Sequence, residues 1–326
     1  MRTFKGSDLK TFEQILQLTQ GGLCRVLSNY LRKHYSKVIE TKDYIVAEGD
    51  IPIALVAHMD TVFQAPPKEI FFDSRLNMMT SPQGLGADDR AGVFAILQIV
   101  RSGLRPHIIF TTDEEMGGLG AYELTSIDCP FKDLRYIIEL DRRGADDCVF
   151  YNHDGKDFID YVEHFGFTYS WGSFSDISIL CPAWGVAGVN LSVGYRDEHT
   201  KGEVLFVGHL YNTIEKVKRM LKVKDIPFFP YISKPCTYDW HIGWGYNEPL
   251  ACTRCKKVFM EEEMFPVVML DGTTGFFCPE CLAEVAWCYN CDSAYEKYYM
   301  EEPDYGLCSK CIELKERELN GSKRCD

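Results

Sequence analysis

Histidine and carboxylate side chains recur next to apolar segments in the N-terminal part of the chain, and side chains of these types bind metal ions. The first pair, His58 and Asp60, directly follows the apolar run 51–57. Four further groups occupy similar places, in chain order Asp88, Glu114 with Glu115, Asp141 and His199. Two histidines and three or four carboxylates form a nitrogen and oxygen ligand set that suits zinc, with cobalt or manganese as alternatives. The pattern predicts the site of a two-metal hydrolase.

Each group has an ordinary explanation when it is considered alone. A single His-x-Asp pair is usually a surface pair, and the adjacent Glu114 and Glu115 could begin a solvated helix. The pair Asp88 and Asp89 could cap the following helix, because acids are favoured at helix N-termini. We assign Asp89 to that capping role. The ordinary explanations do not account for all five groups in this order at successive strand ends.

Alternating strands and helices would bring these groups together. Apolar runs of strand length occur at 44–47, 51–57, 107–111, 136–140 and 186–191. Helical spacing of apolar residues occurs between them and at both ends, at 9–16, 23–31, 91–100, 119–125 and 205–221. Nearly continuous apolar strands separated by helices predict an α/β fold with a largely parallel sheet sandwiched by helices. Ligands of such sheets bind beyond the carboxyl ends of the strands, where the polar groups lie.

The sequences of these motifs resemble those of a known clan of enzymes. His-Met-Asp-Thr, Gly-Ala-Asp-Asp-Arg-Ala-Gly, Thr-Asp-Glu-Glu and Glu-His-Thr are similar to motifs of the co-catalytic di-zinc metallopeptidases, above all peptidase T and its relatives. The clan also includes the leucyl and glutamyl aminopeptidase families. The resemblance spans about residues 38–218.

The resemblance implies a role for each residue. One zinc would be bound by His58 and Asp141 and the other by Glu115 and His199, with Asp88 bridging both.

Two further residues would be catalytic. Asp60 would hydrogen-bond the His58 imidazole and fix its orientation. Glu114 would be the general base. Neighbouring side chains in an extended segment project in different directions, so Glu115 can bind metal while Glu114 stays free to accept a proton.

The spacing of the motifs leaves no room for the extra domains that many relatives carry. Asp88 follows His58 by 30 residues, and His199 follows Asp141 by 58. We therefore expect a bare catalytic core without an inserted lid. Ser175 and Asp176, which resemble a Ser-Asp pair of these families, are expected either to line the substrate pocket or to cap a helix.

Eight cysteines near the C-terminus form four Cys-x-x-Cys pairs. They are Cys252 with Cys255, Cys278 with Cys281, Cys288 with Cys291, and Cys308 with Cys311. Eight thiolates can hold two structural zinc ions in closed four-cysteine sites. A short internal repeat favours sequential pairing, as in LIM or zinc-ribbon modules, and cross-braced pairing as in RING domains is the alternative.

Composition divides the chain into three parts. We expect a catalytic domain at 1–230, a linker rich in proline and aromatic residues at 231–250, and a small zinc-stabilised domain at 251–326. A domain this small needs its metal ions to fold. From Lys234 onward there are 10 basic and 17 acidic residues, a net charge of −7, so nucleic-acid binding is not expected of it. It could instead mediate a homo-oligomer or bind a protein partner.

Charge and hydropathy limit the function further. The 326 residues carry a net charge of −13, and we see neither a membrane-spanning segment nor a signal peptide. With 14 cysteines and no export signal, we expect a cytoplasmic protein with reduced thiols. The predicted activity is cleavage of an amide bond near a peptide terminus, of aminopeptidase or dipeptidase type. The alternatives are an amidase or deacylase of N-acyl amino acids, and a non-catalytic metal-binding adaptor.

Overall fold

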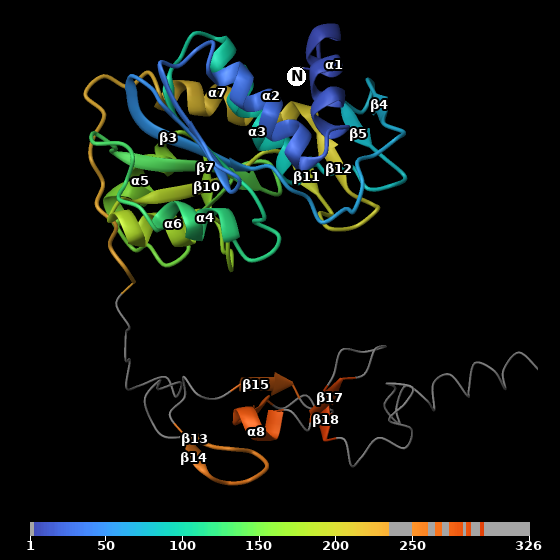
Figure 1. The fold of residues 1–326 in the computed structure, drawn as a ribbon, viewed down its shortest axis with the longest axis vertical. Helices are drawn as coiled ribbons and strands as arrows, with labels where there is room; N and C mark the ends of the chain where they lie inside the picture. Colours follow the sequence, from blue (N-terminus) through green and yellow to red (C-terminus); the bar gives the residue numbers. More distant parts are fainter. Residues whose placement is uncertain are drawn as a thin grey trace, which may run out of the picture. The chain divides into compact units, whose positions relative to one another are not determined.

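A computed structural model of the chain describes residues 3–234, 250–259, 265–268, 274–282, 285–287 and 294–296. The chain divides into two compact units, Met1–Pro235 and Cys236–Asp326 (Figure 1).

An eight-stranded sheet forms the centre of the first unit. Its four central strands, in the order β6-β3-β7-β10, are parallel to one another, while β1, β2 and β8 each pair antiparallel with their inner neighbours. The largely parallel sheet predicted from the apolar runs is therefore confirmed. In sheet order the strands are β1 (Lys37–Glu40), β2 (Tyr44–Glu48), β6 (Pro106–Thr111), β3 (Ile51–His58), β7 (Tyr136–Arg142), β10 (Gly188–Ser192), β8 (Asp147–Val149) and β9 (Thr168–Tyr169).

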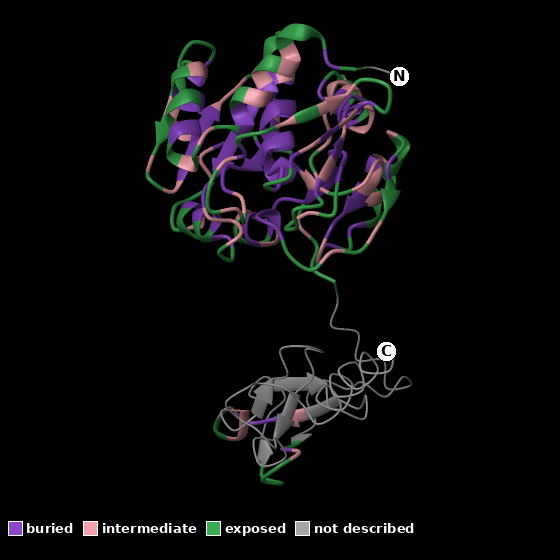
Figure 2. Cartoon of the chain, turned by 90° about the vertical axis from the view of Figure 1, so that its right-hand side faces the viewer, coloured by how far each residue is buried: buried purple, intermediate pink, exposed green. Residues whose placement is uncertain are grey.

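Helices cover both faces of this sheet, as the sequence predicts (Figure 1). The residues of two hydrophobic clusters, one on each face, are buried, and Figure 2 shows them concentrated around the sheet. On one face pack α1 (Gly6–Leu16), α2 (Gln20–Leu31), α3 (Ala87–Arg101) and α7 (Val207–Met220), and α5 (Lys156–His164) adds Phe158 and Val162 to the same cluster. On the other face pack α4 (Leu119–Thr125) and α6 (Ile177–Trp184).

A smaller antiparallel sheet lies in the same unit, in the order β11-β12-β5-β4. This sheet is not predicted from the sequence, because its strands are only two or three residues long. They are β11 (Tyr195–Arg196), β12 (Val204–Phe206), β5 (Met78–Thr80) and β4 (Phe71–Asp73).

This sheet corrects one expectation. His199 lies on the β11–β12 hairpin of the small sheet rather than at the end of a strand of the large one. The chain leaves β10 through Gly194, whose φ of +100° favours glycine. A Cβ there would lie 2.7 Å from the carbonyl oxygen of Phe206, so the turn is closed tightly against β12.

The segment before the second unit packs on the first unit as far as Lys234. The Phe229 ring lies within 6 Å of the Tyr136, Phe158 and Tyr161 rings. The Lys234 N–H donates to the carbonyl oxygen of Asn152 at 2.7 Å. Most of the predicted linker, 235–249, lies outside the described residues.

The described part of the second unit consists of short elements around cysteine turns. Three antiparallel strand pairs and one helical turn, α8 (Pro279–Leu282), are present among the described residues. The pairs are β13 (Leu250–Ala251) with β14 (Val258–Phe259), β15 (Phe265–Val268) with β16 (Thr274–Phe277), and β17 (Val285–Trp287) with β18 (Ala294–Glu296). No helix of the described residues is both long and apolar enough to cross a lipid bilayer.

Candidate metal centre

Asp88 lies between the two histidines predicted to bind metal. It stands at the start of α3, before the backbone becomes helical, and Asp89 caps the helical part by accepting the Gly92 N–H at 2.9 Å. Asp88 Oδ1 lies 3.1 Å from His58 Nε2, and Oδ2 lies 3.1 Å from His199 Nε2. One carboxylate thus presents one oxygen to each of two histidine nitrogens.

A further carboxylate completes each half of this arrangement. Asp141 Oδ1 lies 3.6 Å from His58 Nε2, and Glu115 Oε1 lies 3.1 Å from His199 Nε2. The ligand atoms of His58, Asp88 and Asp141 all lie within 4.8 Å of one another, and so do those of Asp88, Glu115 and His199. Two sets of three donors therefore share Asp88.

Asp60 connects the first histidine to the loop that carries the two glutamates. Its Oδ1 lies 3.2 Å from His58 Nδ1 and accepts the Glu114 N–H at 3.1 Å, and its Oδ2 accepts the Glu115 N–H at 3.0 Å. Although burial opposes it, these bonds and the His58 charge hold the pKa of Asp60 below its ordinary value. An ionised Asp60 orients the imidazole so that Nε2 faces Asp88.

Glu114 lies outside both sets that share Asp88, and with His58 and Glu115 it forms a third set whose donor atoms lie within 4.8 Å of one another. Its Oε2 is 4.0 Å from His58 Nε2. Burial, together with the negative charges of neighbouring acids, raises the pKa of its carboxyl to about 9. A carboxyl in this environment holds protons readily, and nearby cations would restore its charged form.

The chemistry of the donors fits divalent cations. Burial and the Asp88 charge raise the pKa of Glu115 to about 7 and that of Asp141 to about 6, because several carboxylates share a small volume. Glu115 Oε1 is buried and accepts no hydrogen bond from any described group, even though a histidine nitrogen lies 3.1 Å away. A cation between these two lone pairs would satisfy both.

Several residues that were not predicted from the sequence hold the predicted ligands in place. The buried Glu203 accepts the Gly86 N–H at 2.6 Å and the Asp88 N–H at 2.9 Å. The Tyr195 hydroxyl donates to Asp141 Oδ1 at 2.9 Å, and the Asn190 side chain accepts the Asp141 N–H at the same distance. No spacing in the sequence marks these residues, because each reaches its partner through the tertiary fold.

Ser175 and Asp176 lie behind Asp141. The Ser175 hydroxyl donates to Asp141 Oδ2 at 3.2 Å. Asp176 is fully buried, accepts a hydrogen bond from the Thr111 hydroxyl, and makes no side-chain capping bond to α6. Neither side chain lines the large pocket beside the site.

That pocket has a volume of 460 Å³ and reaches the predicted metal site at Asp60 and Glu115. Its walls come from four stretches: the α1–α2 connection (Leu16–Gln20), the loop 60–67 after β3, residues 85–90 at the start of α3, and the loop 113–116 after β6. Ligand sites of proteins commonly have volumes of about 300–1,000 Å³.

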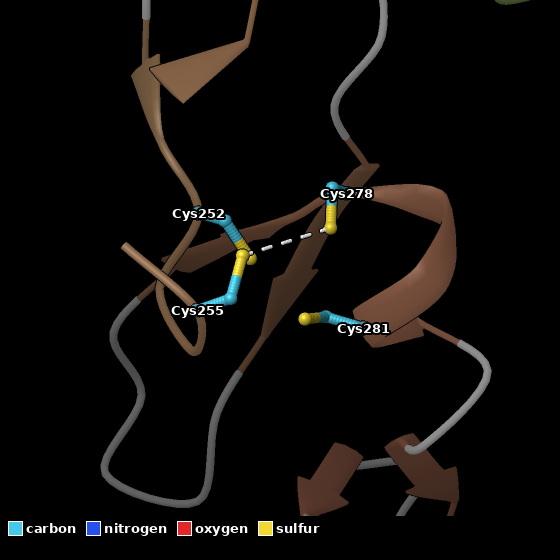
Figure 3. A group of neighbouring side chains, drawn as sticks. All are labelled: Cys252, Cys255, Cys278 and Cys281. Atoms are coloured by element: carbon cyan, nitrogen blue, oxygen red, sulfur yellow. Dashed lines mark hydrogen bonds between the residues drawn. The ribbon is translucent and has the colours of Figure 1, made fainter. Parts of the chain in front are cut away.

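In the second unit, the first four of the eight predicted zinc cysteines lie together. The sulfur atoms of Cys252, Cys255, Cys278 and Cys281 are all within 4.8 Å of one another, and none forms a disulfide (Figure 3). The sulfurs of Cys255 and Cys278 are 3.9 Å apart. A tetrahedral zinc with bonds of about 2.3 Å separates its sulfur ligands by about 3.8 Å.

The electrostatics of this cluster also suit a cation. Although burial opposes it, hydrogen bonds from the backbone N–H groups of Cys278, Cys255 and Arg254 lower the pKa of the Cys252 thiol to about 6. The thiolate is the form that binds zinc. The first Cys-x-x-Cys pair therefore lies with the second, as sequential pairing predicts. The other four predicted ligands lie outside the described residues: Cys288, Cys291, Cys308 and Cys311.

Several solved structures are similar to this chain, whereas no family model and no curated protein matches its sequence. The aminopeptidase PepT from Bacillus cereus is 16% identical, with 65% of this chain and 96% of that chain covered and a TM-score of 0.54. A tripeptidase from Staphylococcus aureus is 16% identical, with coverage of 66% and 97% and a TM-score of 0.55. An aminopeptidase from the archaeon Desulfurococcus kamchatkensis is 14% identical, with coverage of 67% and 95% and a TM-score of 0.53. The chain therefore shares the α/β fold of these peptidases.

Proposed function

We propose that the first unit is a metal-dependent hydrolase that cleaves an amide bond near the terminus of a short peptide, as an aminopeptidase or a dipeptidase does. The observation that carries this proposal is the placement of Asp88, with one oxygen 3.1 Å from His58 and the other 3.1 Å from His199. A carboxylate shared in this way suits a pair of neighbouring cations.

Five side chains would hold these cations. His58 and Asp141 are the donors on one side, Glu115 and His199 on the other, and Asp88 belongs to both sets. Two bound divalent ions, zinc or alternatively cobalt or manganese, would supply a water of lowered pKa and polarise the scissile carbonyl.

Glu114 is the residue we assign to proton transfer. It lies beside both sets of donors, its oxygen is 4.0 Å from His58 Nε2, and its backbone is fixed by Asp60. From this place its carboxylate would take the proton of the attacking water and pass it to the leaving nitrogen. Asp60 acts indirectly by orienting both His58 and the Glu114 backbone.

For the second unit we propose two structural zinc ions in four-cysteine sites. The cluster of Cys252, Cys255, Cys278 and Cys281 supports the first site. Because this first site uses consecutive knuckles, the remaining four cysteines would form the second. Four thiolates leave no coordination position for water, so these ions would stabilise the unit rather than act on substrate.

The pair Glu114 and Glu115 gives a sharp test. Glu114→Gln should keep the metal ions of the first unit and lose about 100–10,000-fold in turnover, since it removes the base and leaves the ligands. Glu115→Gln should instead lower metal occupancy, since it removes a ligand charge. Glu123→Gln, at an exposed position on α4, is the control and should change neither quantity. Loss of metal in Glu114→Gln with retention in Glu115→Gln would show the two roles to be exchanged.

A substrate panel separates the proposed activity from its alternatives. Metal-loaded full-length protein should hydrolyse aminoacyl amides and dipeptides faster than N-acyl amino acids. The reverse order would indicate a deacylase. Full metal loading with no hydrolysis of either class would indicate a metal-binding protein without catalysis.

A further inference from the structure

Apolar and polar residues both line the 460 Å³ pocket beside the metal site, and the apolar ones form slightly more of its surface. They include Leu16, Leu18, Val62, Phe63, Pro66 and Met116. Asp60 and Glu115 also line it, so the pocket is continuous with the place where the scissile bond would lie. A group bound in this pocket would therefore be attached close to the reacting amide.

The pocket is preformed, because side-chain contacts fix its walls. The Gln20 amide donates to Asp113 Oδ1 at 3.0 Å, and its oxygen accepts the Asp113 N–H at 3.3 Å, which ties the start of α2 to the loop after β6. The Phe63 ring packs so closely on Gly84 that a Cβ there would lie 2.2 Å from it. Preformed walls bind a ligand without the cost of ordering loops.

The charges that line the pocket disfavour an anionic ligand. Asp60, Asp113 and Glu115 all contribute to its surface. The cation among the lining residues, Arg90, is only 4% exposed and donates to the carbonyl oxygen of Ile15 at 3.1 Å. Away from the proposed metal ions, an acidic side chain would thus meet Asp113 and apolar walls without an accessible cationic side chain.

We propose that this pocket binds a large apolar side chain, aliphatic or aromatic, of the substrate residue next to the scissile amide. This proposal rests on the proposed hydrolase function and specifies which substrate side chains the enzyme prefers. Burial of such a side chain against these walls supplies binding energy in proportion to the apolar area covered.

Binding to an inactive protein tests the pocket without relying on turnover. Zinc-loaded, full-length Glu114→Gln would be titrated calorimetrically with two dipeptide series, X-Ala and Ala-X, where X is Leu, Phe, Glu or Ala. In one of the two series, Leu or Phe should bind at least about tenfold more tightly than Glu or Ala. Equal affinity for all four side chains in both series would overturn the proposal.

A charge reversal in the wall makes the test specific to this pocket. Leu18→Arg, in the same Glu114→Gln background, should lower the affinity for the Leu and Phe peptides about tenfold and raise that for the Glu peptide. Leu76→Arg is the matched control, because Leu76 is 63% exposed and does not line the pocket. Val62→Arg, at a wall residue that is 42% exposed, repeats the test if Leu18→Arg does not fold. An unchanged side-chain preference in a folded wall variant would contradict the assignment.

The two proposals fail in different ways. If wild-type protein hydrolyses none of the peptides although the wall variants change the binding preference, the pocket stands and the hydrolase function is wrong. If wild-type protein hydrolyses Ala-Ala but shows no side-chain preference, the function stands and the pocket is wrong.

Discussion

Asp60 fixes one histidine of the site and the loop that carries both glutamates. It joins the end of β3 to the loop after β6, through the His58 ring and the N–H groups of Glu114 and Glu115. Both carboxylate oxygens are used as acceptors. A residue outside the sets that share Asp88 therefore fixes one predicted ligand in each of them, His58 and Glu115.

Replacing Asp60 by Asn should weaken metal binding. The amide nitrogen cannot accept a hydrogen bond, so one of the two backbone N–H groups loses its partner, and the negative charge next to His58 is lost. We expect zinc affinity in the first unit to fall about 10–100-fold, measured by competition with a chelator. Asp157→Asn, at an exposed position of α5, is the control. Unchanged affinity in Asp60→Asn would contradict the positioning role.

Glu203 has a similar supporting role for Asp88. Removal of its carboxylate in Glu203→Ala leaves the buried N–H groups of Gly86 and Asp88 without these acceptors, at a cost of about 1–3 kcal/mol each. We expect a lower free energy of unfolding in urea and weaker zinc binding. Glu69→Ala, at an exposed glutamate, should have neither effect. A stable variant with normal zinc affinity would show that Glu203 is dispensable.

At the scale of elements, the approach of α3 to β7 determines where Asp88 lies. A Cβ at Gly92 would lie 2.0 Å from the carbonyl oxygen of Leu140. The backbones of the helix and the strand therefore contact each other directly at Gly92, with no side chain between them. Leu140 precedes Asp141, and Gly92 follows Asp88 by four residues. The same contact therefore sets the distance between two predicted ligands, Asp88 and Asp141.

Gly92→Ala should push the helix away from the strand. We expect destabilisation of about 1–3 kcal/mol in urea unfolding and weaker zinc binding, because the displacement moves Asp88 relative to Asp141. Gly21→Ala is the control, since a Cβ at Gly21 in α2 meets nothing within 4 Å. That change should stabilise the protein by about 0.4–1 kcal/mol. Equal effects of the two changes would exclude the close contact as the cause.

The start of β6 contains a buried histidine that should respond to pH. His107 Nδ1 accepts the Gly49 N–H at 3.1 Å, so Nε2 carries the proton and donates it to Asp133 at 3.1 Å. Burial lowers the pKa of His107 despite the nearby Asp133 charge. The folded state therefore binds fewer protons than the unfolded state, and the stability that His107 contributes is lost as pH falls below about 6.5.

A comparison with His107→Asn isolates this effect. Asn can still accept the Gly49 N–H but does not titrate. Hydrogen exchange of β3 and β6 amides would measure the stability of both proteins. The stability of the wild-type protein relative to the variant should decrease as the pH is lowered from 7.5 to 5.5. A constant difference across this range would contradict the prediction. The acids of the metal site titrate with the opposite effect on stability. Because both proteins contain them, their contribution cancels when the two stabilities are subtracted.

At the scale of the whole molecule, two kinds of metal site are expected in one chain. The first unit has a large hydrophobic core of its own, whereas the cluster of buried residues described in the second unit is formed by Cys252 and Cys278. Removal of metal should therefore affect the two units differently: the first should lose activity and keep its fold, and the second should unfold.

The full-length, reduced protein should contain about four zinc ions, two labile and two tight. Brief treatment with a mild chelator should remove the labile pair and abolish hydrolysis. Cys281→Ser should lose one tight ion and keep the labile pair, while Cys129→Ser, which changes a free cysteine of the first unit, should lose none. Two ions in fully loaded wild-type protein, measured by elemental analysis, would refute one of the two metal assignments.

Much of this arrangement could be predicted from the sequence because its signals are local. A strand such as 51–58 is recognisable from its continuous apolar residues, and His58 and Asp60 follow it directly. A Cys-x-x-Cys knuckle is likewise complete within four residues. The α/β class depends only on such short patterns, and so do the predicted order of metal-binding groups and the predicted thiolate sites.

The tertiary structure alone shows what joins these pieces. Glu203 meets Asp88 across 115 residues, and Gln20 meets Asp113 across 93. His199 reaches the site on a hairpin whose two-residue strand carries no periodic signal, and the partner of the Cys252 knuckle depends on how intervening strands pair. These contacts follow from the path of the whole chain. The type and position of a residue in the sequence do not reveal which distant residue the fold brings next to it.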